Sequence, residues 1–155
     1  MSHPYHRRLL KEHKLLCEDP IPGVQLLSNE EDLKQFLFGI LVADNDLYPS
    51  GDLYKLLIIV TKDYPVDSPL VKFVVQDQND AIPIHPHIYS NGHICLNLLG
   101  EDWTPACLIE SILLSIHSML VHNTNNSRPP DDERYIKNAP IDPKRSRFVF
   151  HDDNV

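Results

Sequence analysis

The chain has 155 residues, of which 42% are hydrophobic and 23% are charged, and this balance predicts one globular domain with a single core. Its net charge of −8 at pH 7 argues against nucleic acid as a partner. The longest apolar run, residues 56–60, is far shorter than the roughly 20 residues that cross a bilayer, and the first residues lack a signal-peptide pattern. We therefore expect no nucleic-acid or membrane partner and a cytoplasmic or nuclear location.

The first predicted element is a basic helix over residues 4–18. Its apolar residues recur at helical spacing, and a proline-rich segment ends it. The helix surface is cationic, which suits an acidic protein partner, although an ordinary solvated helix face explains the charge equally well. The apolar stripe consists of Tyr5, Leu9, Leu16 and Cys17.

Four short segments after the helix predict the strands of one sheet. They are rich in apolar and aromatic residues, and turns that contain Pro, Gly, Asn or Asp separate them. Because the strands are consecutive and joined by short links, we expect an antiparallel meander. The predicted strands span residues 24–27, 35–43, 53–61 and 70–75.

The second half of the chain predicts an irregular segment followed by helices. Residues 76–103 show neither helical nor strand periodicity, and long ordered loops of this kind tend to be functional. A long buried helix is expected to open at Thr104-Pro105, because Thr caps helices well and Pro suits the first turn. Residues 131–138 predict a short further helix, which makes the fold class α+β. We expect a folded domain over residues 1–138 and a flexible polar tail over residues 139–155.

Three cysteines, Cys17, Cys95 and Cys107, cannot all pair with one another, so we expect free thiols rather than a disulfide framework. Cys95 lies in the irregular segment, shortly after the tight-turn signal Asn91-Gly92. That turn would fold His85-Pro86-His87 back beside Cys95 and bring polar N–H donors near its thiol. A nucleophile beside oriented donors is what an acyl transfer requires.

Three motifs give this part of the chain a resemblance to a known family. His85-Pro86-His87 begins ten residues before Cys95, and Trp103-Thr104-Pro105-Ala106 begins eight residues after it. Residues 64–69 form a loop that begins with Tyr-Pro and ends with Pro. The combination resembles ubiquitin-conjugating enzymes, in which a His-Pro-Asn triplet, a catalytic cysteine and a Trp-Ser-Pro-Ala segment have this spacing. The resemblance covers nearly the whole chain.

The resemblance implies the ubiquitin-conjugating (UBC) fold. That fold has an N-terminal helix, a four-stranded antiparallel meander, an active-site loop, a long central helix and a C-terminal helical segment. It also implies that Cys95 accepts ubiquitin as a thioester from an activating enzyme and passes it to an amine of a protein substrate, without a cofactor or a metal. His85 and His87 are the other catalytic candidates.

Two partner surfaces follow from the same resemblance. The ligase-facing loops offer apolar side chains with fixed proline geometry, and the first helix offers exposed positive charge. The residues expected to contact a RING-type ubiquitin ligase are Pro65, Val66, Pro105 and Ala106. Those expected to contact the ubiquitin-activating enzyme are Arg7, Arg8 and Lys11.

Three positions depart from the family's usual residues. His87 replaces an Asn that is viewed as an oxyanion donor or a loop organiser. An imidazole can donate one N–H in its place, act as a base, or only hold the loop. Val66 replaces a Phe and offers less apolar area, and Cys107 replaces a Leu.

A fourth departure concerns an acid that many members carry 32 residues after the cysteine, where it prepares a substrate lysine. This offset falls on Ser127, and Asp131 or Asp132 would replace the acid only if the loop shifts. Such a site loses less with an α-amine, because about 10% of α-amines but below about 0.1% of lysines are unprotonated at neutral pH. The pattern resembles the W-type branch, which is associated with ubiquitin transfer to protein N-terminal α-amino groups. Its marks are His85-Pro86-His87, the Arg-Pro-Pro-Asp of residues 128–131, and His151-Asp152-Asp153.

Ordinary structural roles compete with several of these assignments. Cys17 is expected to pack in the core and Cys107 to be a structural thiol. His85 is expected to be a structural histidine, and His93 to face solvent. A zinc site that combines the histidines with Cys95 is disfavoured, because its spacing matches no common pattern.

Three other functions stay open. The chain could conjugate a different ubiquitin-like modifier, a choice that the sequence discriminates weakly. It could bind ubiquitin without carrying it, although relatives of that kind lack the cysteine. A cysteine hydrolase would need a base oriented by a third group, and no clear orienting group is visible.

Overall fold

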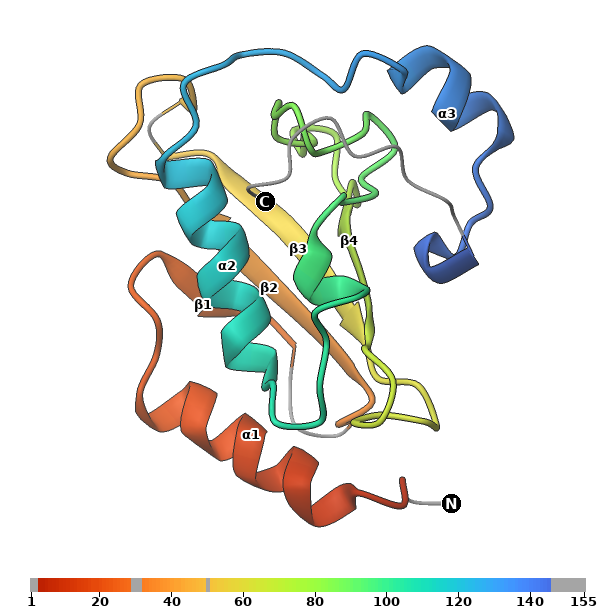
Figure 1. Cartoon of the computed structure of the whole chain (residues 1–155). Coiled ribbons are helices and arrows are strands. Elements are labelled where there is room, and N and C mark those ends of the chain that lie inside the picture. Colours follow the sequence, from red (N-terminus) through yellow and green to blue (C-terminus); the bar gives the residue numbers. More distant parts are fainter. Residues whose placement is uncertain (1–2, 29–31, 50, 146–155) are drawn as a thin grey trace.

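The computed structural model describes residues 3–28, 32–49 and 51–145 and shows a four-stranded sheet with a long helix across one face (Figure 1). The strands lie in chain order and every neighbouring pair is antiparallel, as the sequence predicts. None of the helices in the described ranges is long and apolar enough to cross a membrane. The elements are α1 (His6–Glu18), β1 (Val24–Leu26), β2 (Gln35–Leu41), β3 (Leu53–Ile59), β4 (Leu70–Val74), η1 (Asn97–Leu99), α2 (Ile109–Val121), α3 (Asp132–Asn138) and η2 (Pro143–Arg145).

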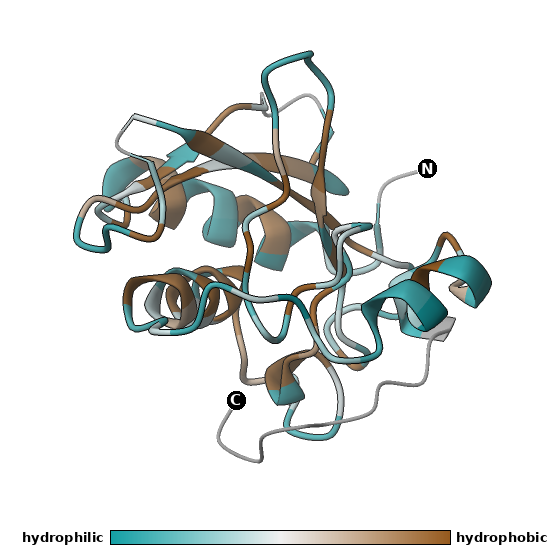
Figure 2. Ribbon diagram, turned by 90° about the horizontal axis from the view of Figure 1, so that it is seen from above, coloured by the Kyte–Doolittle hydropathy of each residue, from teal (hydrophilic) through white to brown (hydrophobic). Residues whose placement is uncertain are grey.

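The core lies between the sheet and α2. Successive side chains of a strand point to opposite faces, so alternate residues of β2 and β3 point inward. The other half of the core comes from α2, and Figure 2 shows hydrophobic residues gathered along the strands and this helix. Burying one such side chain contributes about 1.5–3 kcal/mol. The inward residues of the two strands are Phe36, Phe38, Ile40, Leu56 and Ile58, and those of α2 are Ile109, Ile112, Leu113, Ile116 and Leu120.

The inner face of α1 differs from the predicted stripe. Leu9 and Leu16 are buried, but Tyr5 and Cys17 are exposed. Tyr5 precedes the first helical residue, and the third inward position is taken by Glu12, which is only 5% exposed. The expectation that Cys17 packs in the core is therefore wrong.

The start of α2 also differs from the prediction. Thr104-Pro105 does not open the helix but belongs to a turn, which the Cys107 N–H closes by donating to the Thr104 carbonyl at 2.9 Å. The helix begins at Ile109, whose N–H donates to the buried Glu12 carboxylate at 2.7 Å. Thr and Pro are equally suited to a turn, and a carboxylate from α1 takes the place of a local cap.

Residues 139–145 run back along the body of the protein, and η2 contacts β4. The Lys144 ammonium donates to the carbonyl and the hydroxyl of Ser68 at 2.8 and 2.9 Å and pairs with Asp67 at 3.2 Å. The domain boundary at residue 138 stays a prediction. The motif His151-Asp152-Asp153 lies outside the described residues.

We predict that Gly92→Ala destabilises the protein strongly. Gly92 has a φ of +92°, and a Cβ there would lie 2.0 Å from the Phe73 carbonyl oxygen on β4. We expect a loss of at least about 3 kcal/mol in the free energy of unfolding, from left-handed strain and a backbone clash together. Gly51→Ala is the matched control, because Gly51 has a φ of +90° with nothing within 4 Å of the added Cβ. Urea denaturation that gave equal losses for the two variants would contradict the prediction.

Candidate active site

Cys95 lies on a short hairpin that is docked against β4. Its N–H donates to the His87 carbonyl at 2.8 Å, and one pair further along the Tyr89 N–H donates to the His93 carbonyl at 2.9 Å. The Gly92 N–H closes the turn onto the Tyr89 carbonyl at 2.9 Å. The prediction that Asn91-Gly92 folds the His-Pro-His triplet beside Cys95 is thus confirmed.

The Cys95 thiol is held in its neutral form. The residue is 3% exposed, and burial, followed by the nearby Asp131 carboxylate, raises the pKa of the thiol to about 12. At neutral pH the thiolate is therefore a very small fraction of the free protein. The structure therefore holds a protected thiol rather than an activated one.

An acidic side chain does lie near Cys95, although the 32-residue offset falls on Ser127. The Asp131 oxygens accept from the Tyr89 hydroxyl at 3.1 and 3.2 Å, and the same carboxylate acts electrostatically on Cys95. Its neighbour Asp132 accepts from the Ser90 N–H at 2.7 Å. The linker before α3 therefore brings Asp131 to the cysteine, four residues later in the sequence than the family spacing.

Helix α3 packs against the hairpin through a cluster of three rings, those of Tyr89, His93 and Tyr135. The Tyr135 ring stacks on the Tyr89 ring with 3.7 Å between centroids, and the Tyr135 hydroxyl is 2.7 Å from His93 Nδ1. His93 is 3% exposed, and burial lowers its pKa. The expectation that His93 faces solvent is wrong, because α3 covers it.

His85 is locked in place as a neutral imidazole. Its Nδ1 accepts the His87 N–H at 2.9 Å, and the ring also makes a hydrogen bond with the backbone of Met119 on α2. Burial, and to a smaller extent His87, lower the pKa of His85 to about 4. These contacts fit a structural histidine, and a catalytic role for His85 stays a prediction.

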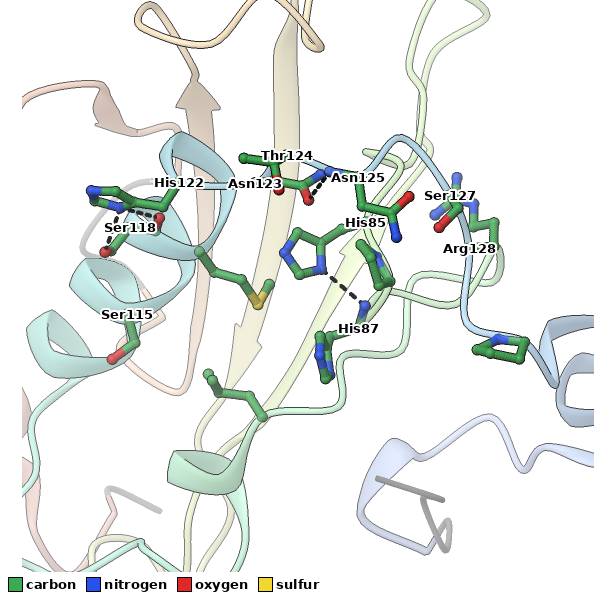
Figure 3. A pocket seen from close by; sticks show the side chains of 14 residues that line it. His85, His87, Ser115, Ser118, His122, Asn123, Thr124, Asn125, Ser127 and Arg128 are labelled. Atoms are coloured by element: carbon green, nitrogen blue, oxygen red, sulfur yellow. Dashed lines mark hydrogen bonds between the residues drawn. The ribbon is translucent and has the colours of Figure 1, made fainter. Parts of the chain in front are cut away.

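His87 lines an open cavity of about 800 Å³ between the active-site loop, the end of α2 and the segment after it (Figure 3). Its ring is 4% exposed, and its centroid lies 5.6 Å from that of His85. Polar side chains of α2 and residues 123–128 form the opposite wall, so an extended peptide segment would find hydrogen-bonding partners there. Within the described part of the chain, no group of three or more His, Cys, Asp or Glu side chains could hold a metal ion.

Arg128 fixes the loop that carries the triplet. Its guanidinium donates to three backbone carbonyls, at 2.9 Å to Ile82, 2.7 Å to Pro83 and 3.1 Å to Ile88. The Tyr48 hydroxyl holds a fourth carbonyl of this loop, that of residue 84, at 2.8 Å. Sequence reasoning missed both residues as parts of the site, and its only signal for Arg128 was the Arg-Pro-Pro-Asp motif.

Comparison with known proteins agrees with this geometry. Residues 8–145 match the family described as ubiquitin-conjugating enzyme. The chain belongs to the ubiquitin-conjugating enzyme family. It is 42% identical over 157 residues to the ubiquitin-conjugating enzyme E2 W of Caenorhabditis elegans, with 100% of both chains covered. It is 38% identical to the probable ubiquitin-conjugating enzyme E2 W of Dictyostelium discoideum, again with 100% of both chains covered. The predicted resemblance to the W-type branch is thereby confirmed.

Solved structures confirm the predicted UBC fold. The ubiquitin conjugating enzyme E2 UbcA1 from Agrocybe aegerita matches with a TM-score of 0.84 and 37% identity, over 92% of this chain and 99% of that one. A ubiquitin conjugating enzyme from Plasmodium falciparum matches with a TM-score of 0.69 and 30% identity, over 78% of this chain and 86% of that one.

Two loops of this ubiquitin-conjugating enzyme, residues 64–69 and 104–107, meet beside Trp103. The Trp103 indole N–H donates to the Pro65 carbonyl at 2.9 Å, and its ring lies 5.9 Å from that of Tyr64. Val66 is 68% exposed, and Pro105 and Ala106 are also exposed, whereas the Pro65 side chain is buried. The two loops thus share one face on which apolar side chains meet solvent.

The basic residues of α1 divide into two sets. Arg7 and Lys11 are exposed, whereas the Arg8 side chain is only 24% exposed. Arg8 turns toward the two loops rather than toward solvent, and its guanidinium donates to the backbone of residues 104–107.

We predict that acid destabilises this enzyme through His85. The pKa of His85 is about 4 in the folded chain against 6.5 for an unperturbed imidazole, so the unfolded chain binds more protons between these values. The contribution of neutral His85 to the free energy of unfolding is therefore present above pH 6.5 and is lost as the pH falls toward 4. The loss between pH 7 and pH 5 is about 2 kcal/mol. Urea denaturation at both pH values measures the loss. In His85→Gln, which keeps a donor and an acceptor without titrating, the loss should be smaller by about this amount. Equal losses in the two proteins would exclude His85 as the cause.

Proposed function

We propose that Cys95 carries ubiquitin as a thioester, received from a ubiquitin-activating enzyme, and passes it to an amine of a protein substrate. The observation that carries the proposal is the hairpin. It holds a protected cysteine at the family position, paired across the hairpin with His87, which also lines the neighbouring cavity.

The chemistry takes place in two acyl transfers. The sulfur of Cys95 attacks the carbonyl of ubiquitin held as a thioester on the activating enzyme, whose thiolate leaves and takes up the proton that the Cys95 thiol loses. An unprotonated amine then attacks the Cys95 thioester, and the carbonyl becomes a tetrahedral oxyanion. The carbon–sulfur bond breaks as the amide forms, and the departing Cys95 thiolate takes up the proton that the amine nitrogen releases. We assign the His87 ring, which can donate one N–H, to the stabilisation of that oxyanion.

The raised pKa of Cys95 bears on both transfers. A thiol with a pKa of about 12 offers little thiolate to the first transfer, and a thiolate of high pKa leaves slowly in the second. We infer that the thioester is retained until a partner changes the surroundings of the sulfur. A ligase that repositions Asp131 or admits water would lower the pKa and hasten departure.

We place the surfaces for the two partner proteins on side chains that are exposed to solvent. Arg7 and Lys11 offer accessible positive charge on α1 for the activating enzyme, and Arg8 adds to it only if its guanidinium leaves the two loops. Val66, Pro105 and Ala106 offer accessible apolar area for a RING-type ligase, with Pro65 as the buried support of the same loop.

We propose the N-terminal α-amine as the preferred acceptor. The Tyr89 hydroxyl shares its proton between the two oxygens of Asp131, and this nearby negative charge raises, rather than lowers, the pKa of an amine that approaches Cys95. An acceptor that needs little help with deprotonation fits such a site, and the α-amine with its pKa of about 7.7–8.0 is that acceptor.

We predict that Cys95→Ser abolishes reductant-sensitive loading with ubiquitin. A hydroxyl forms at most an oxyester, which survives reductant because an alkoxide leaves far less readily than a thiolate. Incubation with activating enzyme, ubiquitin and ATP, followed by non-reducing electrophoresis, measures the loading. Cys17→Ser is the control and should load normally, because Cys17 is exposed on α1. Undiminished thioester on Cys95→Ser would refute the assignment.

We predict that the loaded enzyme prefers a short peptide with a free N-terminus to lysine blocked at its α-amine. The preference should be at least about tenfold at pH 7 and should shrink as the pH approaches 10, because the free-base advantage of the α-amine then fades. Discharge rates of the isolated thioester give the preference, and mass mapping gives the modified nitrogen. Ubiquitin on lysine ε-amines beside an unmodified accessible N-terminus would exclude the α-amine proposal but not the conjugating activity.

A further inference from the structure

Arg8 reaches from α1 to both loops of the ligase-facing surface. One guanidinium nitrogen, Nη1, donates to the Pro105 carbonyl, and the other, Nη2, donates to the Cys107 carbonyl. Nη2 also lies 3.4 Å from the Tyr64 hydroxyl, and the guanidinium sits 5.1 Å from the centre of the Tyr64 ring. These contacts join residues that are 56 to 99 positions apart in the sequence.

Glu12, one helical turn after Arg8, is buried beneath the Arg8 guanidinium and binds the same region. Its carboxylate pairs with Arg8 Nε at 3.2 Å, and it accepts the Tyr64 hydroxyl and the Ile109 N–H. Burial, followed by Glu12, raises the pKa of Tyr64, so its hydroxyl stays a donor. The first turn of α2 and both loops are thus tied to one pair of side chains on α1.

The carbonyls that Arg8 holds lie on either side of Ala106. Fixing Pro105 and Cys107 in this way decides how Ala106 and the Pro105 ring face solvent. Val66 follows Tyr64 by two residues, so the same guanidinium constrains its loop as well. The side chains of Val66, Pro105 and Ala106 are apolar and cannot form hydrogen bonds, so their placement depends on the backbone beneath them.

We propose that Arg8 is the positioning residue of the ligase-facing surface, and that its planar fork holds the two loops in the relative placement that a RING-type ligase binds. The inference rests on the ligase surface proposed above. Its basis is the inward direction of Arg8, which differs from Arg7 and Lys11 on the same helix.

The shape of the side chain separates this role from a simple charge contact. A guanidinium can donate to two carbonyls at fixed separation, whereas a lysine ammonium is a point charge on a flexible stem. Arg8→Lys keeps the charge and the partner of Glu12, but it cannot span Pro105 and Cys107. A charge contact with a partner protein would therefore survive Arg8→Lys, and the positioning role would not.

The first arm of the test measures discharge of the loaded full-length chain with and without a RING domain chosen because it accelerates the unaltered enzyme. We expect both Arg8→Lys and Arg8→Gln to lower the acceleration about fivefold or more, each relative to its own rate without the RING domain. Lys14→Gln is the control, because Lys14 is 72% exposed on the same helix and pairs with Glu18 on that helix; the acceleration of this variant should not change. Full acceleration in Arg8→Lys overturns the proposal.

The second arm measures hydrogen–deuterium exchange at the amides of residues 64–67 and 104–109 in the unloaded chain. We expect faster exchange there in Arg8→Lys and Arg8→Gln, and unchanged exchange in the strands and in Lys14→Gln. Unchanged exchange in the Arg8 variants overturns the positioning role whatever the discharge assay gives. Failure of the unaltered chain to load ubiquitin would instead refute the proposed function. The exchange measurement needs no loading, so it would still test whether Arg8 positions the two loops.

Discussion

The irregular backbone between β4 and α2 can be buried only if its carbonyl groups find donors, because an unpaired buried polar group costs about 1–3 kcal/mol. Side chains from distant parts of the chain supply these donors. Arg128 serves three carbonyls of the triplet loop, Arg8 serves two before α2, and Ser68 donates to the Leu99 carbonyl at 2.8 Å. The active-site loop is therefore ordered by the folded body around it rather than by a regular ladder of its own.

The hairpin within this segment is buried and fixed by backbone pairing in addition. Its backbone pairs with itself and with β4, so it can exclude water without leaving amides unpaired. Exclusion of water then acts on every titratable group nearby, since burial disfavours the charged form of each. It lowers the pKa of His85 and raises that of Cys95. One physical cause thus keeps an imidazole, a thiol and the Tyr89 phenol neutral in the same small volume.

The sequence predicted the parts of this molecule that obey a local rule. The strands and their antiparallel order follow from short apolar segments and turns, and the placement of the triplet beside Cys95 follows from Asn91-Gly92. The roles of Arg8 and Arg128 follow from no local rule, because each contacts carbonyls at least 40 residues away. A side chain that donates to backbone leaves no periodic signal, and its partner can be any residue type. The predictions for His93 and for the start of α2 were wrong for the same reason, because both depend on long-range contacts. Residues of α3 cover His93, and Glu12 of α1 accepts the first amide of α2.

In the proposed function, Asp131 connects the electrostatics of the site to the choice of acceptor. The carboxylate near Cys95 disfavours the thiolate and equally favours a cation in the same place. An arriving ammonium group is therefore attracted, but its pKa is also raised, and only the unprotonated amine can attack. For lysine, whose pKa is already about 10.4, a further rise makes the unprotonated form scarcer still. An α-amine with a pKa of about 7.7–8.0 keeps a larger unprotonated fraction at neutral pH. We infer that an acid placed by the linker rather than at the family offset serves to gather the amine, and that the gain is larger for the amine that releases its proton more easily.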